Sequence, residues 1–158
     1  PVAAEIRTRY PSLPANISLV DGHSPISSYV LAGMADVAMV YSSRFGLELA
    51  VEGRRPWLAG DVTYRGKGFT RDLSSAAEMV AALEAGDRTE PITDEARELA
   101  CRFAYLWFFR AVARVPRLRP PDDRFALDSF RQLAPGADAQ VDRLCDALER
   151  GASFVTPL

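Results

Sequence analysis

The segment "DVAMVYSSRFGLELAVEGRRPWLAGD" (36–61) decides the predicted fold. Residues 36–42 form a short, nearly continuous apolar run, which is typical of a strand buried on both faces. Residues 44–53 then predict a short helix closed by Gly53, and residues 55–61 predict another apolar strand. Strand, helix and strand with brief connections indicate a βαβ unit, and therefore a parallel sheet.

The flanking residues continue this alternation on both sides. Upstream, residues 16–22 ("NISLVDG") predict a first strand, and residues 24–35 a helix with Ser24 as its N-cap and Pro25 at its first position. Downstream, a glycine-containing loop (60–70) leads to a helix over residues 74–86. We therefore predict an α/β fold, a Rossmann-like parallel sheet with flanking helices that right-handed crossovers place on its faces.

The residues after this alternation predict helices alone. Residues 93–115 form a long helical pattern with Thr93 as N-cap, and residues 124–136 and 138–151 predict two more helices. We expect residues 1–90 to form the α/β region and residues 91–158 a helical C-terminal region that packs on it. Three strands are fewer than a typical open sheet has, and the sequence starts at Pro1. We therefore expect a longer protein whose first strands lie upstream.

Composition excludes several classes of function. The formal net charge of −2 argues against a general nucleic-acid binder. The chain has one histidine and two cysteines that are distant in sequence, Cys101 and Cys145. We therefore expect no metal site, and we expect both cysteine thiols to be reduced. No apolar run reaches the roughly 18 residues of a membrane-spanning helix, so we predict a cytoplasmic protein. The aromatic, arginine-containing residues 99–119 favour a core or interdomain helix over one at the inner-membrane surface.

Three loops follow the predicted strands, at residues 21–25, 41–48 and 60–70. Ligands of open parallel sheets bind beyond the carboxyl ends of the strands, where these loops would meet. The first loop offers His23, and the third carries basic side chains between glycines.

The middle loop carries the pattern of a nucleotide site. Backbone amides at the start of a helix favour a phosphate, Ser42 and Ser43 would add hydroxyl donors, and Gly46 would allow close approach of the ligand. Glu48, one turn into the helix, could accept hydrogen bonds from the two hydroxyls of a ribose. Phosphate donors beside a diol acceptor predict a nucleotide.

Each of these features also has a simpler interpretation. Serines at a helix start commonly cap the helix, and an early glutamate suits its dipole. His23 could be a capping residue, the loop glycines could form turns, and Arg65 and Lys67 could be solvated charges. We favour a site because the three signals follow successive predicted strands.

The same residues resemble a known enzyme family. The motifs are "HSP" (23–25), "SSYVL" (27–31), "YSSRFGLELA" (41–50) and "YRGKGFT" (64–70). Together they resemble the donor-binding half of bacterial capsular polysaccharide glycosyltransferases of the GT-B fold. The resemblance covers residues 16–85, and more loosely the aromatic helix.

The resemblance implies roles for individual residues. His23 and Pro25 would lie near the nucleotide phosphate or base, Ser42 and Ser43 would face the phosphate, and Glu48 would contact the ribose. Gly46 would correspond to the glycine of the family's motif. The loop that closes over the donor would comprise Tyr64, Arg65, Gly66, Lys67 and Gly68.

The resemblance also implies a reaction and its partners. The enzyme would bind a nucleotide-activated sugar, such as CMP-activated Kdo, and transfer the sugar to a glycan or glycolipid without a metal or other cofactor. Arg65 and Lys67 would be catalytic, because they would stabilise the charge that develops on the departing phosphate. An N-terminal domain of the same chain would complete the site, so that the excerpt alone would be inactive. Trp57 departs from the family's pattern and leaves the sugar open.

Two other functions remain open at this point. A nucleotide-sugar epimerase of the same two-domain architecture would use a similar phosphate and ribose site. Alternatively, the chain could be a non-catalytic interaction module that retains the fold without the site.

Overall fold

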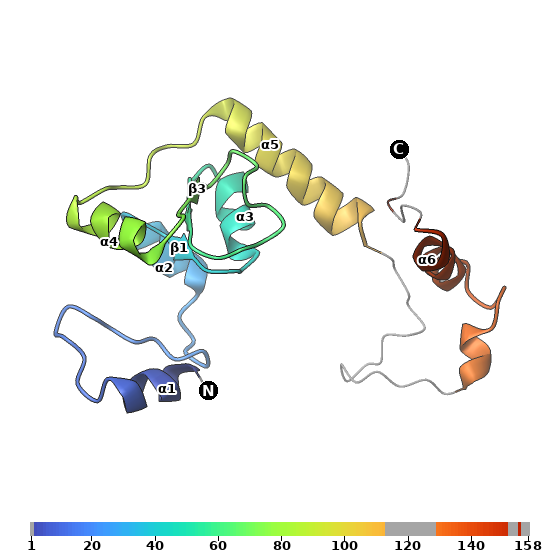
Figure 1. The fold of residues 1–158 in the computed structure, drawn as a ribbon, viewed down its shortest axis with the longest axis horizontal. Helices are drawn as coiled ribbons and strands as arrows, with labels where there is room; N and C mark the ends of the chain where they lie inside the picture. Colours follow the sequence, from blue (N-terminus) through green and yellow to red (C-terminus); the bar gives the residue numbers. More distant parts are fainter. Residues whose placement is uncertain (1, 113–128, 152–154, 156–158) are drawn as a thin grey trace. The chain divides into compact units, whose positions relative to one another are not determined.

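The computed structural model describes residues 2–112, 129–151 and 155. The chain divides into two compact units, residues 1–38 and 39–158 (Figure 1). The structure combines helices with a small, parallel, three-stranded sheet.

The first unit contains two short helices, α1 (Val2–Arg9) and α2 (Ser28–Met34). The predicted helix over residues 24–35 is confirmed, but it starts later than Ser24. Ser27 is its N-cap, and its side chain accepts a hydrogen bond from the amide of Tyr29 at 3.3 Å. Ser24 instead accepts from the amide of Ile26 at 3.3 Å, which holds the preceding turn.

The predicted strand over residues 16–22 is wrong. These residues form turns and irregular structure, and the amide of Ile17 donates to the carbonyl of Pro14 across a turn. Ile17 and Val20 are 51% and 44% exposed. β-branched residues favour a strand when a pleated surface packs them, and this surface is absent around these two side chains.

The sheet lies in the second unit and has the order β1-β2-β3, with all strands parallel. The strands are β1 (Met39–Val40), β2 (Trp57–Leu58) and β3 (Arg71–Asp72). Helix α3 (Phe45–Val51) connects the first two. The βαβ unit predicted from residues 36–61 is therefore confirmed, although each of its strands has only two residues. The burial on both faces that we expected of residues 36–42 is wrong, because Val40 of β1 is buried but Met39 is exposed.

The third strand is β3, which the sequence did not predict. Its residues Arg71 and Asp72 are polar and lack the apolar pattern of a buried strand. The main chain pairs them with β2 through two hydrogen bonds, from the amide of Arg71 to the carbonyl of Pro56 at 2.9 Å and from that of Leu73 to Leu58 at 2.8 Å. A glycine-containing loop makes the crossover from β2 to β3 in place of a helix.

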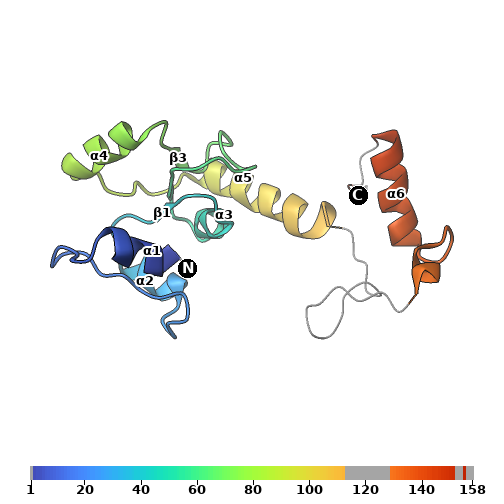
Figure 2. The same ribbon diagram turned by 60° about the horizontal axis from the view of Figure 1, so that its bottom comes forward.

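Three helical segments follow the sheet in the chain, α4 (Ala76–Glu84), α5 (Asp94–Tyr105) and the π-helix η1 (Leu106–Arg110), which continues α5. The views of Figures 1 and 2 agree that α4 and α5 lie on different sides of the sheet. Helix α3 packs against α5, and the shared core joins strand, loop and helix side chains: Val40, Leu47, Ala50, Leu58, Tyr64, Phe69 and Ala100.

Capping side chains set the starts of α4 and α5. Ser75 accepts from the amide of Glu78 at 3.1 Å, and the carboxylate of Glu78 accepts from the amide of Ser74 at 2.7 Å. Thr93 caps α5 by accepting from the amide of Ala96 at 3.2 Å. These local bonds satisfy amides that would otherwise have no intrahelical acceptor.

The helical prediction for the C-terminal residues holds in part. Helix α6 (Ala139–Arg150) confirms the predicted helix over 138–151, and Gly151 ends it in the left-handed conformation. Of the helix predicted over 124–136, the described part holds a 3₁₀ turn, η3 (Phe130–Leu133); residues 124–128, like residues 113–115 of the long helix, lie outside the described residues. Cys101 and Cys145 are free and exposed. Within the described ranges, no helix is both long and apolar enough to cross a bilayer.

Candidate functional site

A cavity of about 360 Å³ opens at the carboxyl edge of the sheet. Its walls come from the segment after β1, the start of α3, the loop after β2 and the π-helix η1. The lining residues are Ser42, Arg44, Leu47, Asp61, Val62, Thr63, Tyr64 and Trp107. This is the edge at which ligands of parallel sheets bind.

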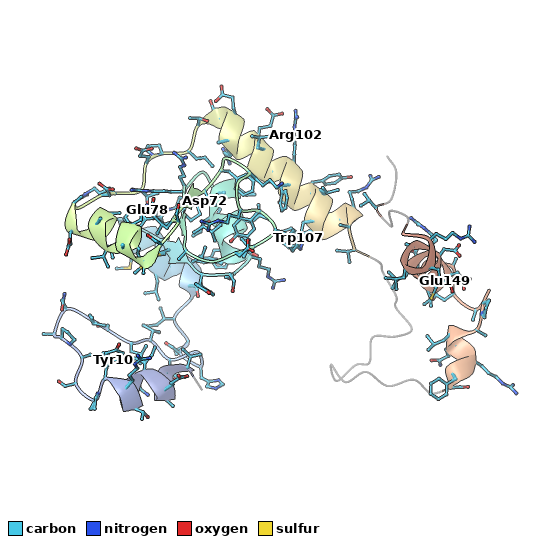
Figure 3. The ribbon with its side chains drawn as sticks, in the orientation of Figure 1. Tyr10, Asp72, Glu78, Arg102, Trp107 and Glu149 are labelled. Carbon is cyan, nitrogen blue, oxygen red and sulfur yellow. The ribbon has the colours of Figure 1, made fainter. Side chains whose placement is uncertain are left out.

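An aromatic row connects the two sides of this cavity. Tyr64 stacks on Phe69 with ring centroids 6.0 Å apart, Phe69 contacts Phe103 at 5.9 Å, and Phe103 contacts Trp107 at 5.6 Å. Figure 3 shows Trp107 near the end of the continuous α5–η1 helix. The core therefore fixes Tyr64 and Trp107, the two aromatic residues of the cavity wall, relative to each other.

Tyr64 is held by both its ring and its hydroxyl. The side chain is 2% exposed, and its hydroxyl donates to the carbonyl of Ser43 at 2.5 Å. Burial raises the pKa of Tyr64, and the negative charge of Asp72 raises it further. The tyrosine is therefore a neutral hydrogen-bond donor that ties the loop after β2 to the start of α3.

The amides at the start of α3 donate hydrogen bonds to acceptors in the same segment. The amide of Phe45 donates to Ser43 Oγ at 3.1 Å, and the amide of Gly46 donates to the carbonyl of Ser43 at 3.2 Å. The next amide, of Leu47, donates to the carbonyl of Arg44 at 2.9 Å. Ser43 precedes the N-cap residue Arg44 and holds the turn before α3, which agrees with the simpler interpretation of the serines as structural residues. The same bonds occupy amides that we expected to meet a phosphate.

Gly46 also has a role in packing. A Cβ at this position would lie 2.5 Å from Tyr64 Oη and 2.8 Å from Val40 Cγ2. The close approach that we expected for a ligand is thus made by Tyr64 and Val40.

The guanidinium of Arg65 binds main-chain carbonyls at the ends of two strands. Its nitrogens donate to Gly60 at 2.9 Å and to Leu73 at 2.6 Å, and Leu58 lies at 3.5 Å. In this arrangement Arg65 fastens the carboxyl ends of β2 and β3 to the loop between them. Its catalytic role stays a prediction, because these contacts supply a structural one.

The rest of the loop is arranged around Asp72, which Figure 3 labels. The carboxylate of Asp72 accepts from the amide of Gly66 at 2.6 Å and from Thr70 Oγ1 at 2.5 Å. Gly66 and Gly68 have φ angles of 72° and 90°, which L side chains rarely adopt. Both glycines thus serve the turn, while Lys67 between them is exposed.

Glu48 does not line the cavity, but Arg44, with which it forms an ion pair, does. Its carboxylate lies 3.7 Å from Arg44 Nε, one helical turn away, and Arg44 belongs to the cavity wall. The acidic side chain of that wall is Asp61, which is exposed and follows β2.

His23 and Pro25 lie in the first unit and are described with it. His23 is an exposed turn residue whose amide donates to Asp21 Oδ1 at 3.0 Å. The strand that we expected to place them at the rim of the sheet is not formed.

Two residues predicted for the site, Ser42 and Tyr64, line the cavity together. Sequence reasoning missed Arg44, Asp61, Thr63 and Trp107. Trp107 had a signal in the aromatic run of residues 103–109, and π-helical segments often mark functional sites. Arg44 lay inside the quoted motif but was not singled out.

Acidic, histidine and cysteine side chains in the described ranges form no group of three that could hold a metal ion. Comparison of the chain with protein-family models, with curated proteins and with solved structures finds no match. The likeness to capsular glycosyltransferases therefore remains a resemblance of motifs.

Proposed function

We propose that this chain is the nucleotide-sugar-binding part of a glycosyltransferase with a Rossmann-like, GT-B-type architecture that builds a bacterial surface polysaccharide. The observation that carries the proposal is the cavity at the carboxyl edge of the parallel sheet, with an aromatic side chain, hydroxyls, a cation and a carboxylate in its wall. Its size, about 360 Å³, lies in the range of small-molecule sites.

The wall offers one group for each part of a nucleotide. The indole of Trp107 is a stacking surface for a base, and the guanidinium of Arg44 suits a phosphate. Ser42 and Thr63 supply hydroxyl donors. Asp61 supplies the carboxylate acceptor for a diol, the role that we first expected of Glu48.

Transfer of the sugar breaks the bond between its anomeric carbon and the phosphate oxygen, and negative charge grows on the departing phosphate. Preorganised cations stabilise that charge. We assign this role to Arg44, which belongs to the cavity wall, since Arg65 is engaged by main-chain carbonyls. The acceptor would be a glycan or glycolipid, and the donor a sugar linked to CMP, UDP or GDP.

Isothermal titration of the purified chain with CMP-, UDP- and GDP-linked sugars tests the proposal. We expect one nucleotide class to bind, and Trp107→Ala and Arg44→Gln each to weaken its binding at least about tenfold, because each removes a wall group of the cavity. Bound ligand at a hundredfold excess over its Kd should raise the free energy of unfolding by about 2.7 kcal/mol.

Arg102→Gln is the matched control, because Arg102 pairs with Glu98 on an exposed face of α5 and lines a different surface. It should leave the affinity unchanged. If all three nucleotide classes fail to bind, the proposal is wrong and the interaction module becomes the better explanation. Equal loss of affinity in Arg102→Gln and Arg44→Gln would place the ligand elsewhere.

A further inference from the structure

A second and larger cavity lies at the opposite, amino edge of the sheet. It has a volume of about 690 Å³ and involves the residues that precede or begin β2 and β3 together with the segment between α4 and α5. Its lining residues are Arg55, Trp57, Arg71, Asp87, Arg88, Thr89, Glu90 and Pro91. An antiparallel bridge between Arg54 and Pro91 holds the segment in place.

The charge in this wall favours an anion. Three arginines and two carboxylates line the cavity, which leaves one net positive charge in its wall. Arg71 is already fixed, since it lies over the ring of the buried Trp57 with its Cζ 4.6 Å from the ring centroid and binds Asp87 at 2.8 Å.

Arg55 is held much less firmly. Its contact with Glu90 is one ion pair at 3.3 Å, and the side chain of Glu90 is 78% exposed. Exposed pairs of this kind contribute little to stability. An anion that enters the cavity can therefore replace Glu90 at the guanidinium of Arg55.

Two polar atoms of the same wall have unmet hydrogen bonds. Arg55 Nε and Thr89 Oγ1 are buried and have no hydrogen-bond partner within the described part of the chain. Buried polar groups are almost always paired, and leaving one unpaired costs stability. An oxyanion at this position would accept from both atoms, once Glu90 moves aside to admit it.

We propose that this cavity binds an oxyanion group, a carboxylate or a phosphate, carried by a small molecule or a sugar. The guanidinium of Arg55 donates to two oxygens of the group through its planar fork, which is the geometry that arginine favours with carboxylates and phosphates. The hydroxyl of Thr89 donates to the same group, and Arg71 on Trp57 adds a fixed positive charge. The proposal is independent of the nucleotide cavity at the other edge of the sheet.

Trp57 provides a local reporter, because the chain has only two tryptophans. In a Trp107→Phe protein the emission comes from Trp57 alone, and a change of charge near Arg71 shifts it. The protein is titrated with inorganic phosphate and, separately, with acetate, at constant ionic strength held by sodium chloride. We expect a saturable change of Trp57 emission with at least one of the two anions, and the one that binds more tightly identifies the group.

Four variants in this background sharpen the test. Arg55→Lys should weaken binding at least tenfold, because a lysine lacks the two-nitrogen fork, and Thr89→Val should weaken it several-fold at nearly unchanged side-chain size. Glu90→Gln should tighten binding several-fold, because it removes the competing carboxylate. Arg150→Lys, on an exposed ion pair of α6, should leave the affinity unchanged.

The proposal is overturned if neither anion produces a saturable change, or if Glu90→Gln binds no more tightly than the parent. It is also overturned if Thr89→Val and Arg55→Lys, with circular dichroism spectra like that of the parent, bind as the parent does. Should Arg55→Lys fail to fold, Thr89→Val and Glu90→Gln decide the question alone.

Discussion

Gly46 shows at the level of one residue how closely α3 approaches the loop after β2. The space that a Cβ would need is occupied by Tyr64 Oη at 2.5 Å and by Val40 Cγ2 at 2.8 Å. The hydroxyl of Tyr64 cannot withdraw without losing its bond to the carbonyl of Ser43. The absence of a side chain at position 46 therefore decides where α3 lies.

Gly46→Ala should lower the free energy of unfolding by about 1–3 kcal/mol, the usual cost of overpacking a core. The measurement is urea unfolding followed by circular dichroism. Gly33→Ala is the control, because Gly33 is also helical but has no atom within 4 Å of its Cβ position. A Gly46→Ala protein as stable as the parent would show that α3 and Tyr64 do not pack as described.

At the level of elements, a side chain compensates for the shortness of the strands. Each strand has two residues, so the ladder itself contributes few hydrogen bonds. Arg65 adds donors to the carbonyls of Gly60 and Leu73, at the ends of β2 and β3. The loop that follows β2 thus holds the edge of the sheet on which the cavity lined by Tyr64 and Trp107 opens.

Arg65→Lys should lower the free energy of unfolding by about 1–3 kcal/mol, since one ammonium cannot reach both carbonyls and leaves one of them unsatisfied. Arg102→Lys, an exposed change on α5, should alter stability by less than about 0.5 kcal/mol. Thermal unfolding of the two variants side by side measures the difference. Equal stability would return Arg65 to the catalytic role that the sequence predicts.

For the molecule as a whole, the ionisation of the buried Tyr64 makes the free energy of unfolding depend on pH. The pKa of Tyr64 is raised in the folded state by burial and by Asp72, so the folded protein retains this proton at a pH where the unfolded chain has released it. Stability is unaffected below the ordinary tyrosine pKa of about 10 and falls as the pH rises from there toward the folded value.

Tyr64→Phe should remove this part of the pH dependence. Above about pH 10, the free energy of unfolding of the parent should fall more steeply with pH than that of Tyr64→Phe. The two slopes should differ by at most about 1.4 kcal/mol per pH unit, which is the contribution of this single group. Denaturant unfolding between pH 9 and 11 compares the slopes. Tyr41→Phe, at an exposed tyrosine, should keep the slope of the parent; identical slopes in all three proteins would contradict the assignment.

Different parts of the molecule were predictable to different degrees. The βαβ unit around residues 36–61 could be predicted because two short apolar runs flank a helical segment, and Val40 of the first run and Trp57 and Leu58 of the second are buried in the core. Strand β3 could not, because polar Arg71 and Asp72 join the sheet through main-chain bonds and loop contacts. Of the predicted site, Ser42 and Tyr64 meet in one cavity, whereas Arg65, Ser43 and Gly46 serve the packing around it.

The sequence by itself determined where α4 and α5 begin and where α6 ends. Ser75, Thr93 and Gly151 act as caps through bonds to residues three or four positions away, and such bonds need no distant partner. Only the tertiary structure decided that residues 16–22 form no strand and that Trp107 lines a cavity together with Tyr64. Both depend on which side chains distant in sequence are brought into contact, because a strand or a cavity wall is stabilised by the surfaces that pack against it.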